Sequence, residues 1–178
     1  MDMVEKARTF AIAAHSAVGE VRKYTGEPYH VHLEEVAWIV QKHGGSQEQI
    51  AAAWLHDVVE DTWVTIDLVQ YMFGPEVSEI VSWLTDVSTY DDGNRPVRKA
   101  IDRAHTARAP KTAKFIKLAD LCSNSRSIVE HDPGFARVYL EEKRLLIEEA
   151  FYDMSGDLFE ETKRLLKEGQ EALKNSKS

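Results

Sequence analysis

Apolar residues recur at helical spacing along nearly the whole chain, and this periodicity strongly limits the folds that it can adopt. The N-terminal segment carries such residues from Val4 to Val18 and predicts a helix that ends near Lys23. The sequence contains no hairpin pattern with alternating polar and apolar residues, and no internal repeat. We therefore expect an all-α fold.

Glycine, proline and polar clusters divide the rest of the pattern. We expect further helices over residues 32–43, 46–61, 66–72, 76–86, 96–107, 111–130, 135–152 and 157–173. Ser46, with Gln49 three residues later, is a plausible capping box at the start of one of them. The stretch VSTYDDGNRP, residues 87–96, predicts a mobile surface loop, and the terminal NSKS is expected to fray. A chain of 178 residues fits one domain.

Composition excludes several functional classes. The formal net charge of −8 argues against a general nucleic-acid-binding protein, which needs basic patches to neutralise phosphates. No apolar run approaches the roughly 20 residues that span a membrane, and the acidic N-terminus is not a signal peptide. Cys122 is the only cysteine, which rules out an internal disulfide and favours a reducing compartment. We expect a cytoplasmic protein.

The stretch LHDVVEDT concentrates charge beside the apolar run AAAW. On a continuous helix His56 would lie one turn from Glu60, and Asp57 one turn from Asp61. Acids are unfavourable near the C-terminal end of a helix unless a positive charge lies among them, and a divalent cation would supply it. The alternative is a solvated acidic face with an incidental histidine.

Two other polar groups could complete such a site. The loop GEPYHVH offers His30 and His32, and either imidazole could be a ligand or an ordinary surface residue. In KLADLCSN, the residues Lys117, Asp120 and Asn124 are three and four apart and share a helix face. Asp120 would be half-buried there and would need a partner, although a surface ion pair with Lys117 is the simpler interpretation.

Two histidines and two aspartates form a ligand set that suits Mn²⁺, Fe²⁺ or Zn²⁺ better than a thiolate-seeking metal. A metal of this kind activates water and stabilises phosphoryl groups. The sequence thus favours hydrolytic chemistry on a phosphorylated substrate.

Taken together, these motifs resemble a known family. AIAAHSAV, RKYTGEPY, IAAAWLHDVVEDT, a V-x-x-LTDV stretch and KLAD…N occur in order over about residues 5–130. The pattern is similar to the HD-domain superfamily of metal phosphohydrolases, and more narrowly to the hydrolase domain of RelA/SpoT-type alarmone enzymes and the stand-alone small alarmone hydrolases. The resemblance implies a single HD-type bundle of about eight to ten helices over residues 1–178, with helices 135–173 beyond the motifs.

The resemblance also implies roles for individual residues. One metal ion, Mn²⁺ by analogy with the family, would be held by four residues, namely His32, His56, Asp57 and Asp120. Glu60 and Asp61 would not ligate, but would orient or deprotonate the attacking water. The family reaction releases pyrophosphate from the ribose 3′ position of a guanosine alarmone.

Substrate contacts are implied less directly. Asn124 matches a position against the nucleotide, and Arg22, Lys23 and Tyr24 match a basic turn beside the nucleoside. Lys117, Arg98 and Arg103 are further candidates for phosphate contacts, or they are simply helix-surface residues. The chain has no room for the synthetase domain of bifunctional relatives, so the expected activity is hydrolysis alone.

The chain departs from the family pattern in several places. Leu33 follows the ligand histidine where proline is usual, LCSNSR stands where RLHNMR is common, and the loop after LTDV lacks a frequent lysine. Because of these departures, the sequence does not determine whether the alarmone contains guanosine or adenosine. They also leave open a phosphohydrolase acting on another nucleotide or a dinucleotide, or a catalytically silent nucleotide-binding module.

Overall fold

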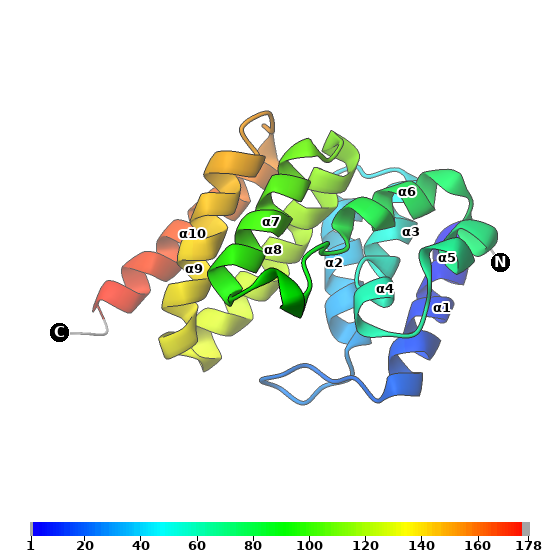
Figure 1. Ribbon diagram of the computed structural model, residues 1–178, viewed down its shortest axis with the longest axis horizontal. Coiled ribbons are helices and arrows are strands. Elements are labelled where there is room, and N and C mark those ends of the chain that lie inside the picture. Colours follow the sequence, from blue (N-terminus) through cyan, green and yellow to red (C-terminus); the bar gives the residue numbers. More distant parts are fainter. Residues whose placement is uncertain (1, 176–178) are drawn as a thin grey trace.

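The computed structural model describes residues 2–175, except for the side chains of residues 126, 127 and 175, and these residues form a helical bundle (Figure 1). No strand occurs among them; one isolated bridge joins Val21 and Pro28. The all-α prediction is confirmed. In chain order the helices are α1 (Met3–Val18), α2 (His30–Lys42), α3 (Gln47–Leu55), α4 (Val58–Asp61), α5 (Ile66–Phe73), α6 (Pro75–Leu84), the 3₁₀ turn η1 (Tyr90–Asp92), α7 (Arg95–Arg108), α8 (Lys111–His131), α9 (Pro133–Ala150) and α10 (Asp157–Asn175).

The long helix α8 runs through the middle of the bundle. It packs against α2, α3 and α6 on one side and against α9 and α10 on the other (Figure 1). Ile116, Leu118 and Leu121 are almost fully buried in this position and join the main hydrophobic core. A helix that is apolar around most of its circumference fits a central place in a bundle. Polar residues in the middle of α8, such as Asp120, are therefore close to several other elements.

Two predicted boundaries were wrong for identifiable reasons. Helix α1 ends at Val18, well before Lys23, because Gly19 adopts a left-handed conformation with φ of 71° and caps the helix. The helix predicted over residues 46–61 is two helices, because the backbone leaves helical geometry at Asp57, with φ of −100° and ψ of −3°. The capping box of Ser46 and Gln49 is confirmed. The break matters for function because it falls within the HD dipeptide.

The stretch 87–96 is irregular apart from η1 and the first residues of α7. Buried Asp102 on α7 accepts hydrogen bonds from the backbone N–H groups of Val87 and Ser88 and from the Ser88 hydroxyl. These bonds hold the start of the stretch against the bundle. The fraying expected at the C-terminus concerns residues that lie almost wholly outside the described part of the chain.

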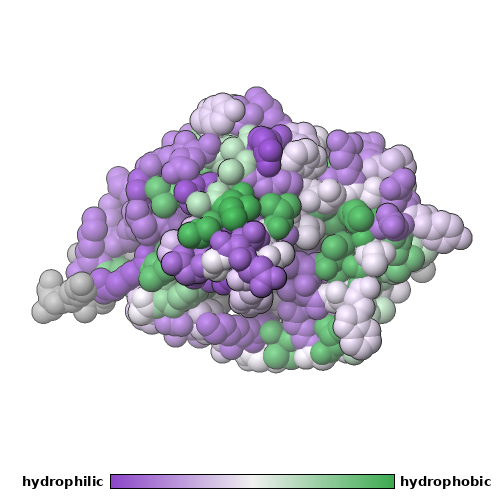
Figure 2. All heavy atoms as spheres, in the orientation of Figure 1, coloured by the Kyte–Doolittle hydropathy of each residue, from purple (hydrophilic) through white to green (hydrophobic). Residues whose placement is uncertain are grey.

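Polar residues cover most of the face shown in Figure 2, and apolar residues lie on it in separate groups. None of the described helices is long and apolar enough to cross a membrane.

Candidate metal centre and active site

Four side chains from three parts of the chain meet at the centre of the bundle. His32 projects from the first turn of α2, His56 and Asp57 from the break after α3, and Asp120 from α8. Nε2 of His32 lies 3.3 Å from Oδ1 of Asp120 and 3.7 Å from Oδ2 of Asp57. Nε2 of His56 lies 2.9 Å from the same Asp57 oxygen and 3.9 Å from Asp120 Oδ1. The structure thus brings the four predicted ligands together.

The other ring nitrogens fix how both imidazoles are presented. Nδ1 of His56 lies 2.8 Å from the carbonyl oxygen of Ala53 and must donate to it. Nδ1 of His32 lies 2.9 Å from Oγ of Ser123, whose hydroxyl donates to Oε2 of Glu35 at 2.7 Å. Because Ser123 uses its proton on Glu35, it can accept one from His32. Each Nε2 is left with a lone pair that faces the two aspartates.

These buried Nε2 atoms provide a test of whether the residues fit a metal ion. Both lie in side chains that are almost fully buried, and among the described residues they face the Asp57 and Asp120 carboxylates at 2.9 and 3.3 Å without forming a well-aligned hydrogen bond. Unpartnered buried nitrogens are uncommon in proteins, and histidine ligands characteristically use the second nitrogen for an orienting bond. The donor set of two imidazoles and two carboxylates fits a divalent transition metal.

The electrostatics of the site also favour a cation. Burial lowers the pKa of His56, but Asp57 and Asp120 outweigh it and raise that pKa to about 9. Burial opposes ionisation of Asp57, yet His56 holds the pKa of this carboxyl below its usual range. The hydroxyl of Tyr29 adds a hydrogen bond of 2.6 Å to Asp57 Oδ2. Two carboxylates held in the charged form require positive charge between them, which a metal ion supplies more fully than a proton.

The hydrogen bond between His32 Nδ1 and the Ser123 hydroxyl leads to a testable prediction. Ser123→Ala should weaken Mn²⁺ binding by roughly 10- to 100-fold, because His32 loses the acceptor that fixes its tautomer. The measurement is competitive metal titration followed by fluorescence or calorimetry. Ser78→Ala is the matched control, because this buried serine on α6 bonds only to the carbonyl of Pro75 among the hydrogen bonds that the structure describes. Equal metal affinity in both variants would contradict the role assigned to Ser123.

Glu60 and Asp61 lie on α4, directly after the break. Oε2 of Glu60 accepts a hydrogen bond of 3.3 Å from the backbone N–H of Asp86. Burial, followed by repulsion from Asp86, raises the pKa of Glu60 above its usual value. Burial and the charge of Asp57 raise the pKa of Asp61 to about 8. Two carboxyl groups with raised pKa values beside a metal-type donor set are suited to general acid–base chemistry.

Asp61 also belongs to a second cluster. A ligand-type atom of Asp61 lies within 4.8 Å of similar atoms of His15 and Glu20. The His15 ring bonds through Nδ1 to Glu20 at 2.6 Å and stacks on Tyr29, with ring centroids 4.9 Å apart. The histidine in the first helix thus supports both Tyr29 and the surroundings of Asp61.

Sequence comparison identifies this arrangement. A family model described as an HD domain matches residues 7–144, which is most of the chain. The chain belongs to the HD-domain family. Its HD dipeptide is His56-Asp57, and the other two predicted ligands are His32 and Asp120.

Individual relatives of this HD domain carry informative names. It is 33% identical over 129 residues to a probable guanosine-3′,5′-bis(diphosphate) 3′-pyrophosphohydrolase from Synechocystis, covering 71% of this chain and 17% of the relative. It is 32% identical over 144 residues to a guanosine-3′,5′-bis(diphosphate) 3′-pyrophosphohydrolase from Aquifex aeolicus, covering 79% and 19%. The chain therefore spans about a fifth of the length of these relatives. The predicted resemblance to alarmone enzymes is confirmed at the level of similarity.

Solved structures support the fold. A structure described as a metazoan orthologue of SpoT that hydrolyses ppGpp superposes with a TM-score of 0.83 at 24% identity, covering 94% of this chain and 96% of that one. A protein from Listeria monocytogenes EGD-e superposes with a TM-score of 0.67 at 25% identity, covering 82% and 99%. The HD-domain bundle is shared by all three.

The structure brings some of the predicted substrate-binding residues to the metal centre. Nδ2 of Asn124 donates to Asp120 Oδ1 at 2.6 Å, and Arg22 donates to Oδ1 of Asn124 at 3.2 Å. Nζ of Lys117 lies 3.7 Å from the other Asp120 oxygen. The predicted common face of Lys117, Asp120 and Asn124 is therefore confirmed. Arg22 closes this side of the site from the loop between α1 and α2.

Other predicted residues contact parts of the HD domain away from the four donors. Tyr24 bonds to Asp132 at 3.2 Å, and the Lys23 ammonium lies over the Tyr24 ring. Arg98 lies over the ring of Tyr90. These contacts place the three side chains at the junction of α8 and α9 and on the loop before α7. The role predicted for them in substrate binding stays a prediction.

Arg103 lies neither with the residues beside Asp120 nor with Lys23, Tyr24 and Arg98. It bonds to Glu149 on α9 and lines a cavity between α7, α8 and α9.

His30, the alternative loop ligand, begins α2, whereas His32 points toward Asp57 and Asp120. Of the two histidines, His32 is the one whose Nε2 lies 3.3 Å from Asp120, and its role as a ligand stays a prediction.

Sequence reasoning did not single out Tyr29, Ser123 or Glu35 as supports of the ligands. Tyr29 is part of the GEPYHVH motif, so its presence beside a ligand histidine was a usable signal. The bond between Ser123 on α8 and Glu35 on α2 joins residues far apart in the chain, and no local spacing reveals it.

Proposed function

We propose that this chain is a metal-dependent hydrolase that removes the 3′-pyrophosphate from guanosine or adenosine alarmones, (p)ppGpp or (p)ppApp. The products would be pyrophosphate and GDP or GTP, or ADP or ATP. The observation that carries the proposal is the meeting of two buried, unpartnered imidazole nitrogens with two carboxylates, in a chain similar to named 3′-pyrophosphohydrolases. The proposed donor set and both acid–base candidates come from residues 32–120.

We assign the metal to His32, His56, Asp57 and Asp120, and take it to be Mn²⁺. Bound there, a divalent ion would polarise a phosphate oxygen and lower the pKa of water. The residues of the chain do the remaining work. Glu60 would accept a proton from the attacking water, and Asp61, whose pKa is raised by burial and by the charge of Asp57, would supply one to the departing 3′-oxygen.

The nucleotide would lie between the metal centre and the loop before α2. Arg22 is hydrogen-bonded to Asn124, which is bonded to Asp120, so a nucleoside held by this pair would be fixed relative to the metal. Arginine can both bond to phosphate and stack on a base. Lys117 would contact the phosphate nearest to Asp120. The buried, single Cys122 is consistent with the cytoplasmic location that we propose.

A substrate panel tests the proposal. Protein loaded with Mn²⁺ is incubated with guanosine and adenosine alarmones, a dinucleotide and simple nucleotides, and the products are resolved by chromatography. We expect pyrophosphate and the 5′-phosphorylated nucleoside from an alarmone. Release of orthophosphate alone would instead indicate a different HD phosphohydrolase. Binding of alarmone without turnover of any substrate would indicate a silent nucleotide-binding module.

A further inference from the structure

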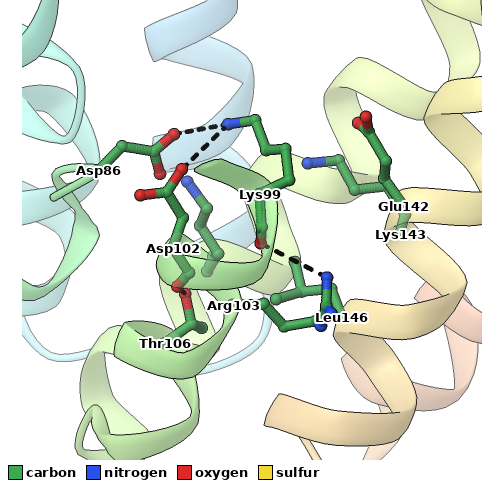
Figure 3. Close-up of a pocket in the computed structure, with 9 residues that line it drawn as sticks. Asp86, Lys99, Asp102, Arg103, Thr106, Glu142, Lys143 and Leu146 are labelled. Atoms are coloured by element: carbon green, nitrogen blue, oxygen red, sulfur yellow. Dashed lines mark hydrogen bonds and ion pairs between the residues drawn. The ribbon is translucent and has the colours of Figure 1, made fainter. Parts of the chain in front are cut away.

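A cavity rich in basic side chains lies between α7, α8 and α9, beside the proposed metal centre. Four of its lining residues are cationic, namely Lys99, Arg103, Lys117 and Lys143, and three are acidic, namely Asp86, Asp102 and Glu142. Figure 3 shows Lys99 paired with both Asp86 and Asp102, with Lys143 extending toward it from α9. The chain as a whole carries a net charge of −8, so this local gathering of cations runs against its overall balance.

Lys143 occupies an unusual position on its helix. The buried face of α9 includes Ala136, Tyr139, Leu140 and Leu146, and Lys143 continues that face one turn after Tyr139. Its ammonium lies 5.0 Å from the centre of the Tyr139 ring. Lysine is rarely placed on an interior helix face without a partner for its charge. The position therefore points to a function in the cavity.

The acids of the cavity are engaged by nearby groups, one of which is Lys99 of the same cavity. Asp86 binds Lys99 at 2.6 Å, and Glu142 forms a two-bond pair with Arg95 at 2.7 and 2.9 Å. Asp102 accepts three hydrogen bonds from the loop after α6. No ion pair joins Lys143 to an acid among the described residues, and burial together with the nearby Lys117 lowers its pKa to about 8. Lys99, Arg103 and Lys117 are each paired with an acid, so Lys143 is the lining cation that an anion would balance.

The cavity is also joined to the metal centre. Lys117 lines it and lies 3.7 Å from Asp120. Asp86 lines it and donates its backbone N–H to Glu60. An anionic group in the cavity would therefore be adjacent to a group bound at the metal, as one phosphate of a chain is adjacent to the next.

We propose that Lys143, together with Lys99 and Lys117, forms a phosphate-binding subsite that holds a substrate phosphate next to the one undergoing hydrolysis. The inference rests on the proposed function and adds a specificity-determining residue from α9, outside the HD-domain motifs. The recognised group is a phosphate of a polyphosphorylated nucleotide. The bound phosphate belongs either to the leaving pyrophosphate or to the phosphates at the 5′ position of the nucleotide.

The test compares wild type with Lys143→Met, which keeps the length and removes the charge, and Lys143→Arg, which keeps the charge. Lys143→Met should raise KM for the hydrolysed alarmone about tenfold or more, with kcat within about twofold, because a charge-assisted contact is lost. Lys143→Arg should restore much of the affinity. Lys167→Met, at an exposed site on α10, is the control and should leave KM unchanged.

Substrates with one, two or three 5′-phosphates identify the source of the bound group. A penalty that grows with 5′ phosphorylation assigns the subsite to the 5′ end, and an equal penalty assigns it to the leaving pyrophosphate. Inorganic pyrophosphate titrated into the metal-loaded protein gives a readout without turnover, and Lys143→Met should weaken this binding if the leaving group occupies the cavity. If wild type hydrolyses no alarmone, the proposed function fails, and the subsite is then judged by pyrophosphate and tripolyphosphate binding alone. Unchanged KM and unchanged binding of both anions in Lys143→Met would overturn the subsite.

Discussion

Asp120→Asn is expected to reduce bound divalent metal to background and to abolish hydrolysis. The Asp120 carboxylate lies 3.3 Å from Nε2 of His32 and 3.9 Å from Nε2 of His56, so it is the donor that links α8 to both imidazoles. An amide in its place keeps the shape but loses the negative charge. The site then has one fewer charged oxygen ligand, and Lys117 beside it is no longer balanced.

Metal content by mass spectrometry after dialysis, and the shift in Tm on adding Mn²⁺, provide the measurements. Wild type should show one ion per chain and a rise in Tm, because a ligand that binds only the folded state stabilises it. Asp120→Asn and Asp120→Ala should show neither. Asp91→Asn, on the exposed turn η1, should behave as wild type. A variant at residue 120 that still binds one ion and turns over substrate would refute the ligand assignment.

The fold was largely predictable because its helices carry their own local signals. Ser46 and Gln49 mark the start of α3, and Pro75 and Pro133 stand at the starts of α6 and α9, where a missing N–H costs nothing. The errors arose where backbone geometry overrode the apolar pattern. Gly19 ended α1 early, and the backbone at Asp57 interrupted a pattern that reads as one continuous helix.

That interruption changes the physical explanation of the HD motif. The sequence suggested that His56 and Asp57 share a face with Glu60 and Asp61 on one helix. The turn at His56-Asp57 instead ends α3 before α4 begins, so the first pair faces His32 and Asp120 while the second pair follows on a separate short helix. Separate elements allow donors and acid–base groups to be oriented independently.

The supporting residues of the site could not be predicted because they depend on contacts between distant segments. Ser123 bonds to His32 across 91 positions and to Glu35 across 88. Lys143 did leave a local signal, since it interrupts the apolar face of α9. A function for Lys143 could be inferred only from the cavity that α7 and α8 form beside it. The residue spacing in α7 and α8 does not show that these helices pack against α9.

Glu60→Gln should keep the metal and lose turnover, in contrast to the Asp120 variants. Glu60 lies on α4, after the turn that presents the ligands, and its carboxylate bonds to the backbone N–H of Asp86. The amide side chain preserves size but cannot accept a proton from water, so kcat should fall by roughly 10²–10⁴-fold. Metal content, KM and Tm should stay near wild type, which separates a proton-transfer defect from loss of the site. Glu79→Gln, an exposed substitution on the neighbouring helix α6, is the matched control for kcat. If Glu60→Gln lost the metal, Glu60 would be a ligand. If the variant kept full activity, Glu60 would not be the base, and Asp61 would be tested in that role.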